Sequence, residues 1–165
     1  MSGGGLQCAY GAGVLVALAE HYRFTTPDIL IAASGSAGTA AYYLSGQKNK
    51  IPMAWISLAT DKKLVSLFRK RAFDIDYLVD EVYKRVHPLN LKNIAKSKTR
   101  FLLPVLRVRD GALQYLRVRD NAKAFQIIKA SMAAPFISGR KVKGNHSYYI
   151  DGGFGPTIHD FTMIL

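Results

Sequence analysis

The sequence predicts an α/β fold, and three observations support this prediction. The apolar run 29–33 is short, rich in isoleucine and alanine and followed by a cluster of small residues, which is typical of a strand buried on both faces. Residues 101–108 and 113–118 have the pattern of two strands joined by an Asp110-Gly111 turn. Segments with helical spacing lie between these strands, so a single α/β domain over residues 1–165 accounts for the pattern.

The helices are predicted from the spacing of apolar side chains. Residues 9–22 are small or aliphatic, and Val14, Leu15 and Leu18 recur at helical intervals, which indicates a buried helix. Asp120 or Asn121 can cap another helix that runs to about residue 133. Further helices are predicted over 39–45, 61–71 and 77–86, and a last short strand over 148–150.

The composition excludes several classes of protein. Apolar residues make up 49% of the chain and charged residues 21%, which excludes a disordered or low-complexity protein. The single cysteine, Cys8, can form no intramolecular disulfide and has no second cysteine for a zinc knuckle. No apolar stretch approaches the roughly 20 residues that span a bilayer. We therefore expect a cytoplasmic protein.

The basic residues are concentrated after the first third of the chain. Lys and Arg number 23 against 11 Asp and Glu, a net charge of +12, and residues 1–50 contribute only one unit of it. Basic segments lie at 62–71, 92–100, 107–119 and 140–143. They can form a solvated face, or bind anionic headgroups at the inner membrane surface, with Trp55, Val65 and Phe68 inserting shallowly. Nucleic acid is the least favoured partner, because no ribonucleoprotein motif, zinc spacing or basic zipper is present.

Ser36 is the candidate nucleophile. It lies between the apolar strand and a small-residue helix, where a tight turn exposes a serine hydroxyl. Such a turn needs small neighbours, and the chain supplies Ser34, Gly35, Ala37 and Gly38. Ser34 stands where the pattern Gly-x-Ser-x-Gly has its first glycine. A tight turn without chemistry has the same local signature.

Two glycine-containing motifs accompany Ser36. In Gly3-Gly4-Gly5, consecutive glycines let backbone N–H groups converge on an anion or a developing oxyanion, although a flexible N-terminal tail has the same composition. A nucleotide-binding loop is a weaker alternative, because the glycine spacing of such loops is absent. Asp151-Gly152-Gly153 ends the last predicted strand and, taken alone, is ordinary turn chemistry.

The histidines offer a weaker alternative. His159 follows Asp151 by eight positions and could complete a Ser–Asp–His triad, although eight residues is short for that arrangement. His21, His87 and His146 have no paired ligand spacing, so we expect no metal site. No cofactor is expected.

The ordered set of motifs resembles the patatin-like phospholipases. It comprises Gly3-Gly4-Gly5, Gly13-Val14-Leu15, the Ser36 turn, Ala130-Ser131 before Pro135, and Asp151-Gly152-Gly153. The segment Phe73–Leu78 is similar to the bacterial branch of that family. The resemblance implies a three-layer α/β/α sandwich and a Ser–Asp dyad without histidine. By this resemblance Ser36 is the nucleophile, Asp151 is the base, and Gly3, Gly4 and Gly5 line the oxyanion hole.

The expected function is therefore that of a serine lipid acyl hydrolase acting on a lipid or other carboxylic ester. The alternative is an inactive patatin-like relative that binds lipid or nucleic acid through its basic surface. Only Met1 and Ser2 precede the glycine loop, and the chain ends at Leu165, soon after the Asp-Gly-Gly turn. We expect a family domain that is incomplete at both ends.

Overall fold

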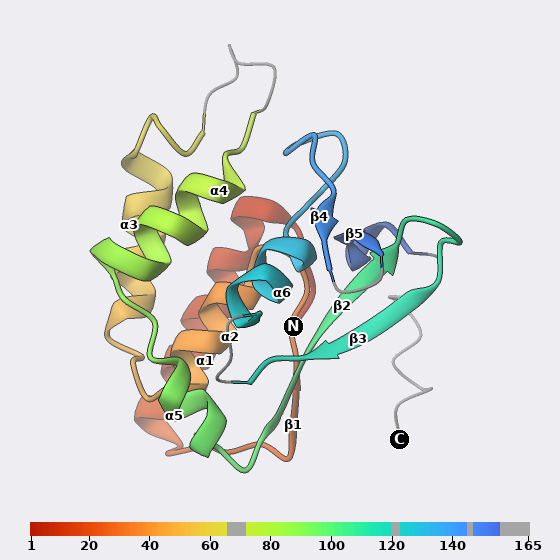
Figure 1. Cartoon of the computed structure of the whole chain (residues 1–165). Coiled ribbons are helices and arrows are strands. Elements are labelled where there is room, and N and C mark those ends of the chain that lie inside the picture. Colours follow the sequence, from red (N-terminus) through yellow and green to blue (C-terminus); the bar gives the residue numbers. More distant parts are fainter. Residues whose placement is uncertain (66–71, 120–122, 145–146, 156–165) are drawn as a thin grey trace.

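Figure 1 shows a computed structural model of the protein, which describes residues 1–65, 72–119, 123–144 and 147–155. The α-helices are α1 (Cys8–His21), α2 (Ser36–Leu44), α3 (Lys50–Thr60), α4 (Ile75–Tyr77), α5 (Leu91–Lys96) and α6 (Ala124–Ser131). The 3-10 helices are η1 (Gly5–Gln7) and η3 (Gly152–Phe154), and η2 (Leu78–Val86) is a π-helix that continues α4. The strands are β1 (Ile29–Ile31), β2 (Arg100–Arg107), β3 (Leu113–Arg117), β4 (Val142–Lys143) and β5 (Tyr148–Asp151).

Strand β2 is the centre of a five-stranded mixed sheet. Strand β1 pairs with it in parallel, and β3 and β5 pair with it in antiparallel orientation. Val105 of β2 pairs with a residue of β3 and also with Asp151 of β5, so β3 and β5 lie on opposite edges of β2. Leu102 pairs with β3 and also with Ile31 of β1, so β1 lies on the same edge as β5. The strand that leads into the serine turn and the strand that ends at Asp151 therefore share one edge of β2.

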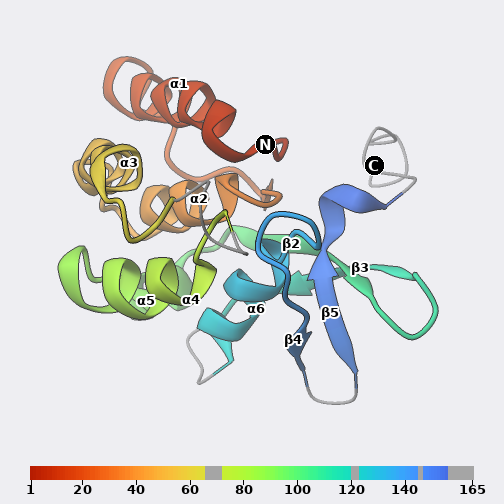
Figure 2. The same cartoon turned by 90° about the horizontal axis from the view of Figure 1, so that it is seen from above.

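The helices pack against one another and against the sheet. Helix α6 contacts β2, β4 and β5, and helices α1, α2 and α3 contact each other (Figure 2). All nine residues of α2 are buried, which its small side chains permit. The hydroxyls of Tyr42 and Tyr43 leave this buried helix and donate hydrogen bonds to the carbonyls of His87 and Phe24. The core therefore surrounds the helix that follows the serine turn.

Most of the predicted elements are confirmed, and the boundaries differ by a few residues. The helix predicted over 39–45 begins earlier, at Ser36, and the predicted strand 29–33 ends at Ile31. Helix α3, helix α5 and strand β4 were not predicted. The helix predicted over 61–71 is wrong in its described part, because residues 61–65 form a turn that ends in a β-bridge between Val65 and Phe73. Residues 66–71 lie outside the described residues, as do the predicted caps Asp120 and Asn121. No helix within the described ranges combines the length and apolar character needed to cross a membrane.

Candidate active site

Ser34 occupies the sharp turn between β1 and α2. Its φ of +52° lies in the left-handed region, which is uncommon for a residue other than glycine and is found at strained functional turns. The backbone N–H of Ser34 donates to the Ser131 hydroxyl at 3.3 Å, which ties the turn to the end of α6. Ser34 also lines an apolar cavity. The residue in the strained conformation is therefore Ser34, two positions before the predicted nucleophile.

Ser36 is the first residue of α2 and has 1% of its surface exposed. Its backbone N–H donates to the Ala33 carbonyl, and its hydroxyl donates to the Ser2 carbonyl at 2.8 Å. The hydroxyl also contacts the buried Cys8 thiol, whose pKa is raised by burial and partly lowered by the hydrogen bond with Ser36. In this geometry the Ser36 hydroxyl joins the N-terminal segment to α2.

Asp151 ends β5 with its side chain buried. Its carboxylate accepts a hydrogen bond from the Gly153 N–H at 2.8 Å and lies beside the Ser34 side chain. Burial raises the pKa of Asp151 above its usual range, although the Ser34 side chain and the Gly153 N–H partly lower it. A carboxylate with a raised pKa is a stronger base, and this one contacts a serine hydroxyl.

The sheet topology explains why residues more than a hundred positions apart meet. Strand β1 runs along one edge of β2 and stops opposite Leu102, and β5 runs along the same edge in the opposite direction and stops opposite Val105. The two strand ends therefore point toward each other across a short interval of β2. Ser34 follows the end of β1, and Asp151 is the end of β5.

The glycine loop, Gly3-Gly4-Gly5, packs against the turn that contains Ser34 and Gly35. Gly4 and Gly5 have φ values of +141° and +58°, which favour glycine. A Cβ added at Gly3 would lie 3.0 Å from the Ser34 Cβ, and one added at Gly35 would lie 2.8 Å from the Gly5 carbonyl oxygen. Only residues without side chains allow this close approach, which brings the loop against Ser34.

The Asp-Gly-Gly turn is equally crowded. A Cβ added at Gly152 would lie 2.5 Å from the backbone carbon of Pro104, so the turn packs directly on β2. Gly38 has a similar role in α2, where an added Cβ would lie 2.1 Å from the Tyr83 hydroxyl oxygen. The small residues predicted around the site are thus explained by close packing.

An apolar cavity of about 250 Å³ lies beside Ser34. Its lining is almost entirely hydrophobic and combines the glycine loop, α3, η2 and the segment after α6. The lining residues are Gly5, Leu6, Ser34, Gly35, Trp55, Leu58, Val65, Ala72, Phe73, Leu78, Tyr83, Met132, Ala134 and Ile137. Trp55 and Val65, which the sequence placed at a membrane surface, both line this cavity, and Phe68 lies outside the described residues. The cavity offers an apolar environment to a group bound beside Ser34.

The histidines lie apart from this site within the described residues. His87 exchanges a hydrogen bond with the Ser57 hydroxyl at 3.1 Å, and the alternative triad member His159 lies outside the described residues. Over the described ranges, no group of three His, Cys, Asp or Glu side chains could hold a metal ion.

The fold and site define an α/β protein in which a strained serine at a strand-to-helix turn contacts a buried carboxylate. Residues 1–161 match the family model described as patatin-like phospholipase. The chain therefore belongs to the patatin-like phospholipase family, whose general activity is lipid acyl hydrolysis. No curated protein matches the sequence.

Sequence reasoning missed two features of the site. The turn contains two serines with small neighbours, and the pattern alone favoured Ser36 because Gly38 follows it at the usual spacing. Ser34 has the equivalent arrangement of a small residue two positions before and two positions after, namely Ala32 and Ser36. The sequence assigned Trp55 to membrane insertion, and nothing in the pattern placed it at this cavity, because α3 was not predicted.

Proposed function

We propose that the protein is a serine lipid acyl hydrolase in which Ser34, rather than Ser36, is the nucleophile and Asp151 is the base. The observation that carries this proposal is the approach of the Ser34 side chain to the Asp151 carboxylate at the strained turn, where the ends of β1 and β5 face each other. A nucleophile beside its base is the arrangement that covalent catalysis needs. The Ser36 hydroxyl, in contrast, donates to the Ser2 carbonyl.

The reaction follows from these contacts. The Ser34 Oγ attacks the ester carbonyl carbon while its proton passes to Asp151, and a tetrahedral oxyanion forms. Backbone N–H groups of Gly3, Gly4 and Gly5 stabilise the oxyanion, and losing one such donor typically costs about 10²–10³ in rate. When the intermediate collapses, the ester C–O bond breaks and the alcohol leaves with the proton from Asp151. Water then attacks the acyl-enzyme, with Asp151 again as base, and releases the carboxylic acid.

The apolar cavity supports a lipid substrate. An ester whose carbonyl lies at Ser34 can place its acyl chain in the cavity of about 250 Å³, where burial of methylene groups contributes about 0.8 kcal/mol each. The leaving alcohol then lies on the open side of the turn. The family relationship and the cavity chemistry point to the same class of substrate.

Labelling with a fluorophosphonate tests the choice of nucleophile. We expect a single adduct on Ser34, identified by peptide mapping, together with turnover of p-nitrophenyl esters. Ser34→Ala should abolish both. Ser36→Ala is the matched control: it should keep the adduct and retain turnover, and lower the free energy of unfolding by about 1 kcal/mol for the lost hydrogen bond. An adduct on Ser36 would return the nucleophile to the position that the sequence pattern predicts.

Absence of both adduct and turnover in a folded protein would favour the other candidate, an inactive relative that binds lipid or nucleic acid. The net charge of +12 is the observation behind that candidate. Association with nucleic acid that weakens steeply with salt would support it.

A further inference from the structure

Trp55 separates two cavities. It lines the apolar cavity beside Ser34, and it also lines a groove of about 320 Å³ between α1 and α3. Among the described lining residues, Trp55 is the only one common to both. Trp55 therefore lies between the apolar cavity beside Ser34 and this groove.

The Trp55 indole is held in place. Its Nε1–H donates a hydrogen bond at 2.9 Å to the Thr39 hydroxyl, which belongs to the fully buried helix α2. Trp55 is partly buried and packs against the core, and the partner of its N–H fixes the plane of the ring. Since α2 begins at the serine turn, Trp55 is attached to the same helix that positions the site.

The groove beyond Trp55 offers room for a chain of methylene groups. It is lined mostly by small and aliphatic side chains, with two polar residues among them. The lining comprises Ala9, Ala12, Gly13, Val16, Ala17, Glu20, His21, Ile51, Pro52 and Trp55. Replacing the indole with a small side chain would join this groove to the cavity beside Ser34.

We propose that Trp55 determines the length of acyl chain that the site accepts, an inference that rests on the proposed function. At about 30 Å³ for a water-sized group, a cavity of 250 Å³ holds about eight such groups, which corresponds to a chain of medium length. A longer chain meets the indole. Removing the indole opens the groove and admits the additional methylene groups.

Ester hydrolysis over a series of chain lengths tests the proposal. The wild-type protein should prefer p-nitrophenyl esters of about eight carbons, and Trp55→Ala should raise kcat/KM for the sixteen-carbon ester relative to the eight-carbon ester by about tenfold. Ile56→Ala is the matched control, because Ile56 is the next residue of α3 and is 61% exposed. Thr39→Val removes the acceptor of the indole N–H. This variant should hydrolyse a wider range of chain lengths than wild type, but its preferred chain length should increase less than that of Trp55→Ala.

A binding measurement gives a readout that does not depend on turnover. Trp55 is the only tryptophan in the sequence, so its fluorescence reports on this side chain alone. Fatty acids brominated at successive carbons, titrated into the Ser34→Ala protein, should quench most strongly when the bromine lies near the end of an eight-carbon chain.

The outcomes separate the two ideas. If esters are hydrolysed but Trp55→Ala and Ile56→Ala have the same chain-length profile, the role of Trp55 is refuted and the proposed function stands. If no ester is hydrolysed but the quenching depends on the position of the bromine, the proposed function is refuted, whereas the role of Trp55 in limiting the bound chain is supported. Should Trp55→Ala fail to fold, Trp55→Leu keeps an apolar side chain in α3 and should give the same direction of change.

Discussion

Ser34 combines an unfavourable backbone conformation with a reactive side chain. Its φ of +52° costs roughly 1–2 kcal/mol for a residue with a Cβ, because the Cβ approaches the following carbonyl oxygen. The hydrogen bond from its N–H to the Ser131 hydroxyl and the contact of its side chain with Asp151 hold it in this conformation. The turn is therefore strained, and it places Ser34 at the edge of the cavity.

Comparison of two inactive variants measures this strain. Ser34→Ala removes the hydroxyl and keeps the Cβ, whereas Ser34→Gly removes both. We expect Ser34→Gly to have the higher free energy of unfolding by about 1 kcal/mol, since glycine adopts positive φ without the steric cost. Urea denaturation of the two proteins checks this. Equal stabilities, or a less stable glycine variant, would show that the turn is unstrained.

The raised pKa of Asp151 predicts the pH dependence of activity. Only the ionised carboxylate accepts the Ser34 proton, so kcat/KM should rise with pH through a pKa above the ordinary aspartate value of 3.8. Asp151→Asn should lower kcat by about 10²–10⁴, the usual contribution of a general base. If kcat/KM rises through a pKa at or below 3.8, the ordinary aspartate value, Asp151 is excluded as the base.

The raised pKa of Asp151 also predicts that the free energy of unfolding falls as pH rises, whereas activity increases. A carboxyl whose folded pKa is raised favours folding while it is protonated, and this contribution is lost as pH rises from its unfolded pKa through its folded pKa. At neutral pH the buried charge therefore destabilises the fold, and Asp151→Asn should unfold at a higher temperature than wild type. At pH 3 the advantage should shrink.

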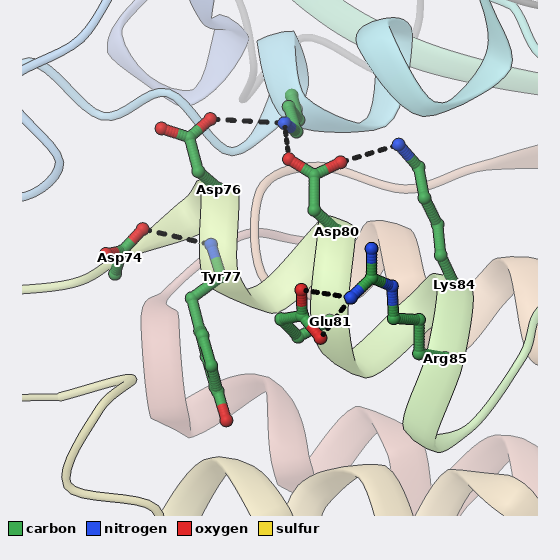
Figure 3. Close-up of polar contacts among 8 residues, drawn as sticks. Asp74, Asp76, Tyr77, Asp80, Glu81, Lys84 and Arg85 are labelled. Atoms are coloured by element: carbon green, nitrogen blue, oxygen red, sulfur yellow. Dashed lines mark hydrogen bonds and ion pairs between the residues drawn. The ribbon is translucent and has the colours of Figure 1, made fainter.

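At the scale of elements, an ion-pair network joins α6 to α4 and to η2, and η2 lines the cavity. Lys129 of α6 binds Asp76 of α4 and Asp80 of η2, and Figure 3 shows these two carboxylates side by side. Arg140 also binds Asp76, at 2.7 Å. Burial raises the pKa of Asp80, but hydrogen bonds from Lys129 and Lys84 outweigh burial and lower it. Two acids of the Phe73–Leu78 segment thus have structural partners, Asp74 by capping α4 and Asp76 by binding α6.

Lys129→Ala should destabilise the protein by about 1–2 kcal/mol, because it leaves two carboxylates near a half-buried position without their shared cation. Arg85→Ala is the control: Arg85 pairs with Glu81 on the exposed face of η2 and should cost no more than about 0.5 kcal/mol. Thermal or urea unfolding measures both. Equal effects would mean that the network contributes no more than an ordinary surface pair.

Glycines in two helices should respond to alanine in opposite ways. Gly38→Ala in α2 meets the Tyr83 hydroxyl and should cost about 1–3 kcal/mol, as overpacking usually does. Gly13→Ala in α1 meets nothing within 4 Å and should stabilise the helix by about 0.5–1 kcal/mol. Unfolding curves of the two variants give the signs, and a tolerated alanine at position 38 would show that η2 can move away from α2.

At the scale of the whole molecule, the charge predicts an association with anionic membranes. Each cation near the surface contributes about 1 kcal/mol at low salt, and the chain carries a net charge of +12. Cosedimentation with vesicles containing phosphatidylserine should fall steeply between 50 and 500 mM salt, whose Debye lengths are about 14 and 4 Å. Equal binding to neutral vesicles would exclude an electrostatic mode.

The sequence was informative wherever local chemistry decides the structure. The apolar run of β1, the Asp110-Gly111 turn and the position of Asp151 all depend on neighbours in sequence, and these predictions match the fold. Two serines with small neighbours give nearly the same pattern, and which of them lies beside Asp151 depends on the path of the turn and on the docking of β5. Trp55 reaches the site only through the packing of α3 on α2, which no local pattern records.

The shared edge of β2 has a consequence for synthesis of the protein. The serine turn is made early, but its carboxylate belongs to a strand more than a hundred residues further along and can be placed only after β2 exists. A nascent chain on the ribosome therefore carries the hydroxyl without its proton acceptor. If Ser34 and Asp151 act as proposed, hydrolysis requires that translation has passed Asp151 and that β5 has paired with β2.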